Sequence, residues 1–576
     1  MSNVSAGNRS VAVPTLGSPD VILHTGRVYT AEAPDYGTPA VVPGFVSQAI
    51  AISGEHVTAT GTNRQILALA QNDTRIINLH DRVVIPGLID SHNHMSVLGQ
   101  SILGCDISEV ESIADLQDVI RAAVLASEPG AWIFTSKVGE SVISHELREA
   151  RYPDRWELDM VAPNNPLCVR SFHVGILNTA ALDSLALTRF TQSPAGGEIG
   201  RRSYPPGELD GRFYESAWMD LVAPRLPEPS FEERVTAIEL AARRLNEVGV
   251  TQVCEHGIDW NTWEAYKSAE RSHRLPMKVS THLLIAPGSH IADAGVAITE
   301  VGKIRRQISA KKRVTLDGVK VMIDGGVALG TAYFSRPYTT TYGERSNGIL
   351  VTQPERLRAI VRSCLENDVQ LSHHASGDAA IATVLDAYDA VADPEDIRRS
   401  RFIIVHCQFP TDESIERIVD RRVLLAMQTL FMYNMGEGYT KYHGIRGEYA
   451  NPLRRLIDAG CHVGLGSDAP VNQYSPYMGA WHAMTRMCKA TGKTMGAGQA
   501  ITATEAFDCY TRANAYFGFR ERSSGTLSAG KSADLAILED VPDFSSLSTT
   551  LATKTLCTIL DGDVVHGSLD AVGSPR

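Results

Sequence analysis

Residues 83–94 read VVIPGLIDSHNH, and this stretch decides the fold. An apolar run meets a Pro-Gly turn, continues as a second short strand, and ends at His92 and His94. Residues two apart in an extended chain point to the same side, so both imidazoles face one direction. Histidine nitrogens are ligands for zinc and similar ions. The stretch therefore predicts a buried strand that ends on a pair of metal ligands.

The chain that follows alternates short apolar strands with amphipathic helices. Helical spacing of apolar residues marks 111–127 and 230–249, and Ser230 ahead of two glutamates is typical of a helix start. Alternating strands and helices are typical of βαβ units in a parallel sheet. We therefore predict an α/β fold in which residues 83–520 form a (β/α)₈ barrel of the TIM type.

The number of strands predicts an insertion in this barrel. From Val83 to Asp468 about ten strands can be recognised, whereas a closed barrel needs eight. The surplus lies between residues 130 and 285, and we expect the insertion at about 140–230. Residues 196–212, GGEIGRRSYPPGELDGR, have the Gly, Pro and charge content of an exposed loop within it.

Both ends of the chain have a different character from the barrel. Residues 20–82 and 521–576 contain short β-branched runs closed by Gly turns, which are typical of antiparallel strands. We expect the two segments to join in one small β-sandwich domain, with the barrel inserted between them. Residues 1–19 lack periodicity and are predicted to be a flexible arm.

Several later strands end on residues that bind metals. Residues 369–374 end in His373 and His374, residues 402–406 in His406, and residues 462–468 in Asp468. Barrel enzymes place their active sites at the carboxyl ends of the strands. Each residue alone could cap a loop, but their repetition in one barrel favours a common metal site. We interpret His373 as a neighbour of the site, and His256, which also ends a strand, as a residue of the pocket.

Lys320 is the remaining polar residue on an apolar strand, residues 318–324. A buried lysine without a partner is costly, so its pKa shifts or it finds a counter-charge. A neutral amine can react with carbon dioxide to give a carbamate, which can bridge two metal ions. The alternative is an ion pair with a nearby carboxylate such as Asp324.

Composition limits the other classes of function. The chain has 576 residues, 66 acidic and 54 basic, for a net charge of −12, and this charge disfavours nucleic acid as a partner. The nine cysteines form no Cys-x-x-Cys pair, which favours a reducing compartment. Neither a signal peptide nor a membrane-spanning run is evident, so we expect a cytoplasmic protein that does not bind membranes. Symmetry statistics favour a homodimer.

Several blocks together resemble amidohydrolase family 3, the YtcJ-like hydrolases, which include an N-substituted formamide deformylase. The resemblance runs from about residue 20 to 565, and its blocks are VVIPGLIDSHNHM, LDGVKVMIDGGVALGTAYFSRPY, HHASGDAAIATVLDA, RFIIVHCQ, LRRLIDAGCHVGLGSDAPV and GTLSAGKSADLAILE. It implies a hydrolase of a non-peptide C–N bond in a small molecule. It also implies a composite β-sandwich, in agreement with the prediction above.

The resemblance also implies site residues. The implied metal ligands are His92, His94, Lys320, His374, His406 and Asp468, and they would hold one or two divalent ions, with zinc favoured. His173 and Asn178 match a further sequence block of the family, Gly-His-x-x-Trp-x-Asn, although this chain has Ile176 where the block has tryptophan. Val405 also departs from the family, which usually has a glutamate there. We therefore expect His173, Asn178 and His256 to contact the substrate.

In the expected mechanism, a metal lowers the pKa of a water molecule and Asp468 moves its proton to the leaving nitrogen. His173 would help to stabilise the developing oxyanion. A mononuclear deaminase on the same barrel is the main alternative, but no strand ends in the His-x-x-Glu that such enzymes carry. A dehydratase or an isomerase stays open, as does a non-catalytic assembly protein with a relic barrel.

Overall fold

Eight parallel strands form the centre of the molecule. The computed structural model describes residues 18–32, 47–108, 110–136, 143, 147–171, 174–194, 197–202, 207–309, 312–327, 330–339 and 345–575. The eight-stranded sheet has the order β21-β20-β19-β18-β15-β14-β13-β7. Its strands are β7 (Leu88–Asn93), β13 (Val250–Ile258), β14 (Lys278–Leu284), β15 (Val314–Met322), β18 (Gln370–Ala375), β19 (Ile403–His406), β20 (Leu424–Met427) and β21 (His462–Leu465). The predicted TIM-type barrel is confirmed.

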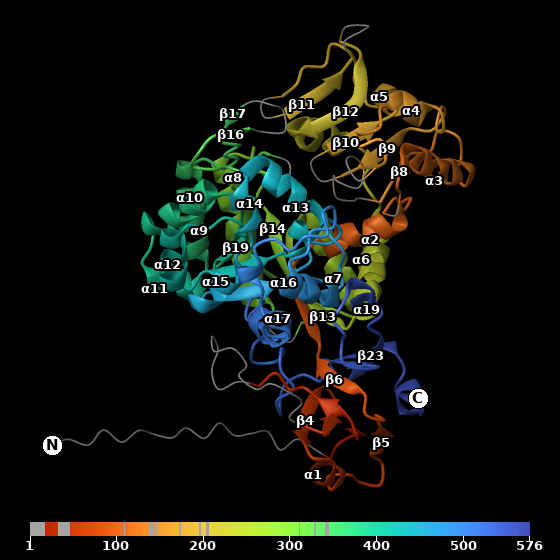
Figure 1. Cartoon of the computed structure of the whole chain (residues 1–576), viewed down its shortest axis with the longest axis vertical. Coiled ribbons are helices and arrows are strands. Elements are labelled where there is room, and N and C mark those ends of the chain that lie inside the picture. The colour runs from red at the N-terminus through yellow and green to blue at the C-terminus, as the bar shows by residue number, and fades with distance from the viewer. Residues whose placement is uncertain are drawn as a thin grey trace, which may run out of the picture.

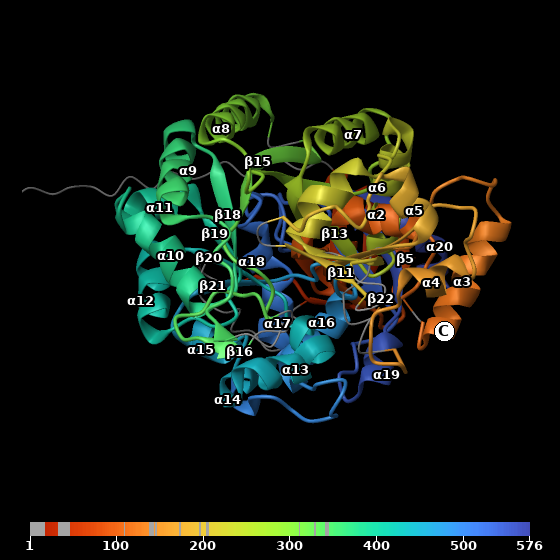
Figure 2. The same ribbon diagram turned by 90° about the horizontal axis from the view of Figure 1, so that it is seen from above.

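Helices surround these strands (Figure 2). Most of these helices cover the outward faces of the strands and share one large apolar core with them, whereas the buried residues of α13 (Leu430–His443) belong to two smaller clusters. The main ones are α2 (Met95–Leu103), α6 (Phe231–Asn246), α7 (Trp260–Arg271), α8 (Ile291–Gln307), α9 (Pro354–Asn367), α10 (Asp378–Asp389), α12 (Asp412–Arg421), α13 (Leu430–His443), α16 (Pro476–Thr485) and α17 (Ala503–Cys509). Helix α6 begins as predicted, because the Ser230 hydroxyl accepts a hydrogen bond from the Glu233 amide. In the described part of the chain, no helix has both the length and the hydropathy needed to span a bilayer.

The barrel has a seam between its first and last strands, β7 and β21. The Asn514 amide closes it, donating hydrogen bonds to the carbonyl oxygens of Ile89 at 2.5 Å and Leu465 at 2.7 Å. Because each of these oxygens belongs to a different edge strand, one side chain holds both edges together.

Segments from both ends of the chain build a small β domain at one end of the molecule (Figure 1). One sheet contains β1 (Val21–His24), β3 (Ala49–Ser53), β4 (His56–Gly61) and β5 (Arg75–Asn78). The other contains β2 (Arg27–Val28), β6 (Val83–Pro86), β22 (Leu535–Leu538), β23 (Thr555–Leu560) and β24 (Asp563–Gly567). Apolar residues of both termini share one core, including Leu23, Ile50, Ile537 and Ile559.

The border between this domain and the barrel lies later than we expected. Strand β6 pairs with β22, so residues 83–86 belong to the small domain and not to the barrel. The barrel begins with β7, after Gly87. A Cβ atom at Gly87 would lie 2.2 Å from the Thr251 hydroxyl oxygen, so only glycine fits this crossing point. Residues 83–89 form one continuous apolar stretch in the sequence. Only the strands with which they pair show that residues 83–86 belong to the small domain and residues 88–89 to the barrel.

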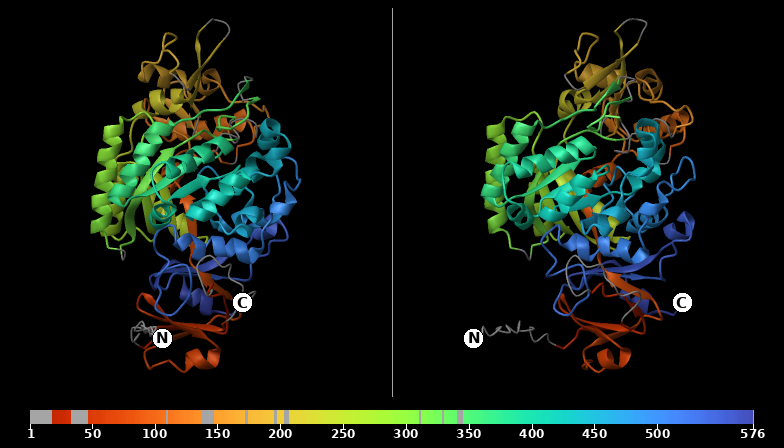
Figure 3. Two further views of the ribbon diagram at one scale, coloured as in Figure 1. Left: turned by 90° about the vertical axis from the view of Figure 1, so that its left-hand side faces the viewer. Right: turned by 60° about the vertical axis from the view of Figure 1, so that its left-hand side comes forward.

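The insertion has its own five-stranded sheet and lies over the barrel end opposite the β domain (Figures 1 and 3). Its strands are β8 (Ile133–Phe134), β9 (Leu167–Arg170), β10 (Val174–Leu177), β11 (Gly197–Arg201) and β12 (Leu209–Glu215). Helix α3 (Ile113–Leu125) packs into the core of this sheet. The insertion therefore reaches back before the expected start at about residue 140, because the apolar stripe of α3 faces the insertion and not the barrel.

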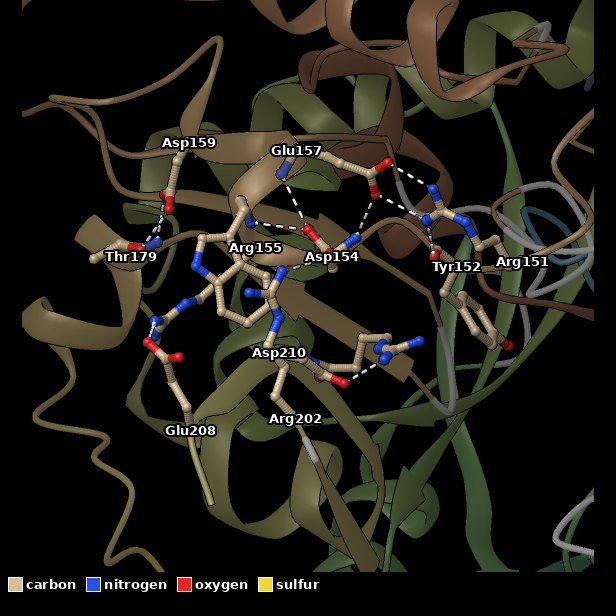
Figure 4. Close-up of polar contacts among 12 residues, drawn as sticks. Arg151, Tyr152, Asp154, Arg155, Glu157, Asp159, Thr179, Arg202, Glu208 and Asp210 are labelled. Carbon is tan, nitrogen blue, oxygen red and sulfur yellow. Dashed lines mark hydrogen bonds and ion pairs between the residues drawn. The ribbon is translucent and has the colours of Figure 1, made fainter. Parts of the chain in front are cut away.

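Polar contacts around a short helix, α4 (Arg155–Asp159), stabilise the insertion (Figure 4). The Asp154 carboxylate caps this helix and accepts a hydrogen bond from the Glu157 amide at 3.1 Å. Arg151 pairs with Glu157 at 2.7 Å, and the Thr179 hydroxyl donates to Asp159 at 2.5 Å. These contacts all join residues of the insertion to one another.

A buried ion pair connects the β domain to the barrel. The ammonium group of Lys278 lies 2.6 Å from a carboxylate oxygen of Asp534 and 2.6 Å from one of Asp561. Lys278 and Asp534 are each about 5% exposed, so water does not replace a lost partner.

We predict that Lys278→Met lowers the free energy of unfolding by about 3–5 kcal/mol, because it leaves the buried carboxylate of Asp534 without its counter-charge, whereas Asp561 keeps Arg313 at 3.3 Å. Calorimetric melting of the variant measures this loss. The control is Lys303→Met, which removes an exposed pair with Glu300 and should cost about 0.5 kcal/mol or less. Equal melting temperatures for the two variants would contradict the prediction.

Candidate metal centre

The predicted ligands gather at the carboxyl ends of the barrel strands, at the end that faces the insertion (Figures 1 and 3). Nε2 of His92 lies 3.2 Å from Oδ1 of Asp468, and Nε2 of His94 lies 3.1 Å from the same oxygen. Nε2 of His406 lies 4.0 Å from Oδ2 of Asp468. Three imidazoles from the first and sixth strands therefore converge on one carboxylate after the last strand.

This cluster has the spacing of a metal site. Among the described residues, potential ligand atoms of His92, His406 and Asp468 all lie within 4.8 Å of one another, and all three side chains are buried. Burial lowers the pKa of His92 to about 3 and that of His406 well below its usual value, so both imidazoles are neutral. A neutral imidazole is the form that binds metal ions.

Asp468 is ionised in this setting. Burial alone would raise its pKa, but the adjacent His92 and His94 hold the pKa well below the usual value. The residue takes a left-handed backbone conformation, with φ of 60°, and His406 does so with φ of 75°. Such conformations are costly for residues other than glycine and are concentrated at functional sites.

A second carboxylate orients His374. The rings of His374 and His406 have centroids 4.5 Å apart, and Nδ1 of His374 lies 3.1 Å from Oδ1 of Asp324. Asp324 is fully buried and also accepts hydrogen bonds from the amides of Ser376 and Gly377. A carboxylate on one ring nitrogen fixes the tautomer and leaves the other nitrogen for a metal. Sequence reasoning considered Asp324 only as a partner for Lys320 and missed this role.

Lys320 is buried in the barrel, where 3% of its surface is exposed. Among the described residues, its amine nitrogen has no hydrogen-bond partner. The ion pair with Asp324, which the sequence left open, is absent from the described contacts, because that carboxylate serves His374 and backbone amides. Burial lowers the pKa of Lys320 to about 7, so a large fraction of the amine is neutral near neutral pH. An orphaned, neutral amine beside a histidine cluster fits a metal site with a modified lysine.

Asp90 is a further residue that sequence reasoning did not single out. Its carboxylate accepts hydrogen bonds from the His92 amide at 3.0 Å, the Asn93 side chain at 3.0 Å, and the Ser467 amide and hydroxyl at 3.1 and 2.6 Å. It therefore connects the segment that carries His92 to the segment that carries Asp468. An acidic residue in an otherwise apolar strand was the signal for it.

The remaining predicted residues lie in three different settings. His256 is inside the barrel, with its ring centroid 4.9 Å from that of His92. His373 lies beside the site, where Nδ1 is 3.0 Å from the Ile403 carbonyl oxygen and 3.2 Å from the Tyr388 hydroxyl. His173 lies outside the described residues.

Asn178 is a helix cap within the insertion. Its side-chain oxygen accepts hydrogen bonds from the amides of Leu167 and Ala181, both at 2.9 Å. Its amide nitrogen donates to the carbonyl oxygens of Ala162 and Asn165 at 2.7 and 2.9 Å. These contacts give Asn178 a structural role, and substrate contact is not needed to explain its side chain.

We predict that Asp324→Asn weakens metal binding about 10- to 100-fold, because the amide does not fix the His374 tautomer as the carboxylate does. Titration of the metal-free protein against a competing chromophoric chelator measures the affinity. The matched control is Asp386→Asn, which changes an exposed partner of Arg417 and should leave affinity unchanged. Unchanged affinity in the Asp324 variant would contradict the assignment.

Known proteins resemble this chain over most of its length. The N-substituted formamide deformylase of Arthrobacter pascens is 27% identical over 534 residues, covering 90% of this chain and 94% of that protein. The putative amidohydrolase YtcJ of Bacillus subtilis is 24% identical, covering 95% and 99%. A solved structure of an uncharacterised metal-dependent hydrolase from Pyrococcus horikoshii has the same fold, with a TM-score of 0.71, 22% identity, and coverage of 92% and 99%. The sequence model of the amidohydrolase family matches residues 75–566, well over half of the chain, so the protein belongs to the amidohydrolase family and is a hydrolase.

Proposed function

We propose that this protein hydrolyses a non-peptide C–N bond in a small molecule, with N-substituted formamides as the first substrate class to test. The observation that carries the proposal is the buried carboxylate of Asp468, whose Oδ1 lies 3.2 Å from Nε2 of His92 and 3.1 Å from Nε2 of His94. The similarity to a formamide deformylase over 90% of the chain supports the choice of bond. Amides, carbamates and cyclic amides share the same reacting carbonyl and nitrogen.

The metal would be held by His92, His94, His374, His406, Asp468 and a carbamate on Lys320. Imidazole and carboxylate ligands suit zinc, which is our first choice, and one or two ions fit this number of ligands. A divalent metal bound there supplies Lewis-acid activation of water and of the substrate carbonyl.

Asp468 would then move the proton. Its carboxylate accepts a proton from the attacking water and later delivers it to the leaving nitrogen, acting first as a general base and then as a general acid. Its neighbours His92 and His94 keep it ionised before the reaction. His173 would donate a hydrogen bond to the developing oxyanion. The insertion lies over this end of the barrel, so it would form part of the pocket wall.

Phe431 would form another part of that wall. Its ring packs at 5.6 Å, centroid to centroid, on the ring of His406, and it is only half-buried. It therefore offers an apolar surface beside a predicted metal ligand. A substrate with an apolar substituent next to the scissile bond would fit this surface.

The test is hydrolysis of a panel of N-substituted formamides, N-acyl amines and cyclic amides, followed by detection of the released amine and acid. We predict that Asp468→Asn lowers kcat by about 10²–10⁴-fold, because the amide cannot carry the proton. The control Asp543→Asn changes a solvent-exposed carboxylate and should keep full activity.

Full activity in the Asp468 variant would contradict the proposed role of Asp468 in proton transfer. Release of ammonia from an amino-substituted heterocycle added to the panel, with none of the amides cleaved, would instead identify a deaminase, the alternative on the same barrel. Failure of every C–N substrate in a protein that has its metal would refute the proposed bond.

A further inference from the structure

Several buried polar side chains of the barrel strands have a polar atom without a hydrogen-bond partner in the described part of the chain, and His256 and Lys320 are two of them. Neither ring nitrogen of His256 has a partner, and the side chain is fully buried. The amine of Lys320 has none either. A buried donor without an acceptor carries its whole desolvation penalty, so native proteins satisfy such groups with protein, water or a ligand. A ligand that both His256 and Lys320 contact would satisfy the two groups together.

His256 is held firmly by other imidazoles. Its ring centroid lies 4.3 Å from that of His282 and 4.9 Å from that of His92. His282 is itself fixed, since its two ring nitrogens lie 2.9 Å from the Ser372 hydroxyl and 2.9 Å from the Gln370 side-chain oxygen. The position of the His256 ring is therefore set before any ligand binds.

The stem of Lys320 lies against strand β13 at Gly257, the residue that follows His256. A Cβ atom on Gly257, the next residue on strand β13, would lie 4.0 Å from Cγ of Lys320. An imidazole carries at least one N–H in either protonation state, so His256 can donate a hydrogen bond to an acceptor beside it.

An anion attached to Lys320 would satisfy both groups. The neutral amine attacks the carbon of carbon dioxide, a new N–C bond forms, and one proton leaves the nitrogen for the solvent buffer. The product is a carbamate with one negative charge and two oxygens, and no oxidant or reductant is needed. Hydrogen bonds to a charged acceptor are stronger than those between neutral groups.

We propose that His256 is a positioning residue that donates its N–H to the carbamate on Lys320. This inference rests on the carbamate of the proposed function and assigns His256 to the modified lysine, not to the substrate. The donor stabilises the carbamate and leaves oxygen lone pairs for the metal. Direct metal binding by His256 is the competing explanation, although His256 is not part of the close cluster of His92, His406 and Asp468.

The experiment compares wild type with His256→Leu and His256→Gln, all as metal-loaded full-length protein. Each is equilibrated with ¹³C-bicarbonate, and the carbamate signal is measured by ¹³C NMR as a function of bicarbonate concentration. His256→Leu should need about 10-fold more bicarbonate for half occupancy, the effect of losing one hydrogen bond to a charged group. His256→Gln keeps an N–H donor and should lie closer to wild type. Excess bicarbonate should restore both carbamate and metal content in the leucine variant.

The matched control is His373→Leu, which removes another buried imidazole of the same barrel at a position bonded to the Ile403 carbonyl. It should titrate like wild type. Equal bicarbonate dependence in wild type and His256→Leu would overturn the inference while the proposed carbamate stands. If both His256 variants lose metal and bicarbonate does not restore it, the inference is overturned in favour of direct metal binding by His256. Absence of the signal in wild type would overturn the carbamate itself, and this inference with it.

Discussion

The carboxylate of Asp90 is the constraint on which the site depends. It is buried at the seam of the barrel and accepts hydrogen bonds from groups beside the first and last strands. Burial raises its pKa to about 6, and these hydrogen bonds favour the charged form. A buried polar network of this kind stabilises one arrangement only when all its members are satisfied. His92 and Asp468 are brought together because Asp90 holds the two segments that carry them.

The barrel interior also holds buried polar groups away from the seam, which is unusual for a fold whose centre is normally filled by branched apolar residues. His256, His282 and Lys320 are all buried there, and burial lowers the pKa of each. Such groups reduce stability in the metal-free protein. Metal binding and lysine modification would recover that free energy, since ligand binding and folding are coupled in such sites. Proteins often depart from local rules of stability at functional sites, and the chemistry explains the departure here.

Local patterns in the sequence predicted the barrel, the composite β domain and the residues at the strand ends. His92, His406 and Asp468 were recognisable because each ends a short apolar run. The predictions that were wrong or missed depend on contacts between residues that are far apart in the chain. Residues 83–86 resemble a barrel strand, and only their pairing with β22 assigns them to the small domain. Helix α3 carries an ordinary apolar stripe, and its sequence does not say which core it faces. The role of Asp324 depends on its approach to His374, 50 residues later.

The central claim is that these side chains form one metal centre to which Lys320 contributes. Elemental mass spectrometry on protein purified without chelator measures it most directly, as metal ions per chain in wild type and in Lys320→Ala. The account predicts close to two ions per chain in wild type and clearly fewer in the variant. One ion in both proteins would contradict the role of Lys320, and no metal in either would contradict the metal centre itself.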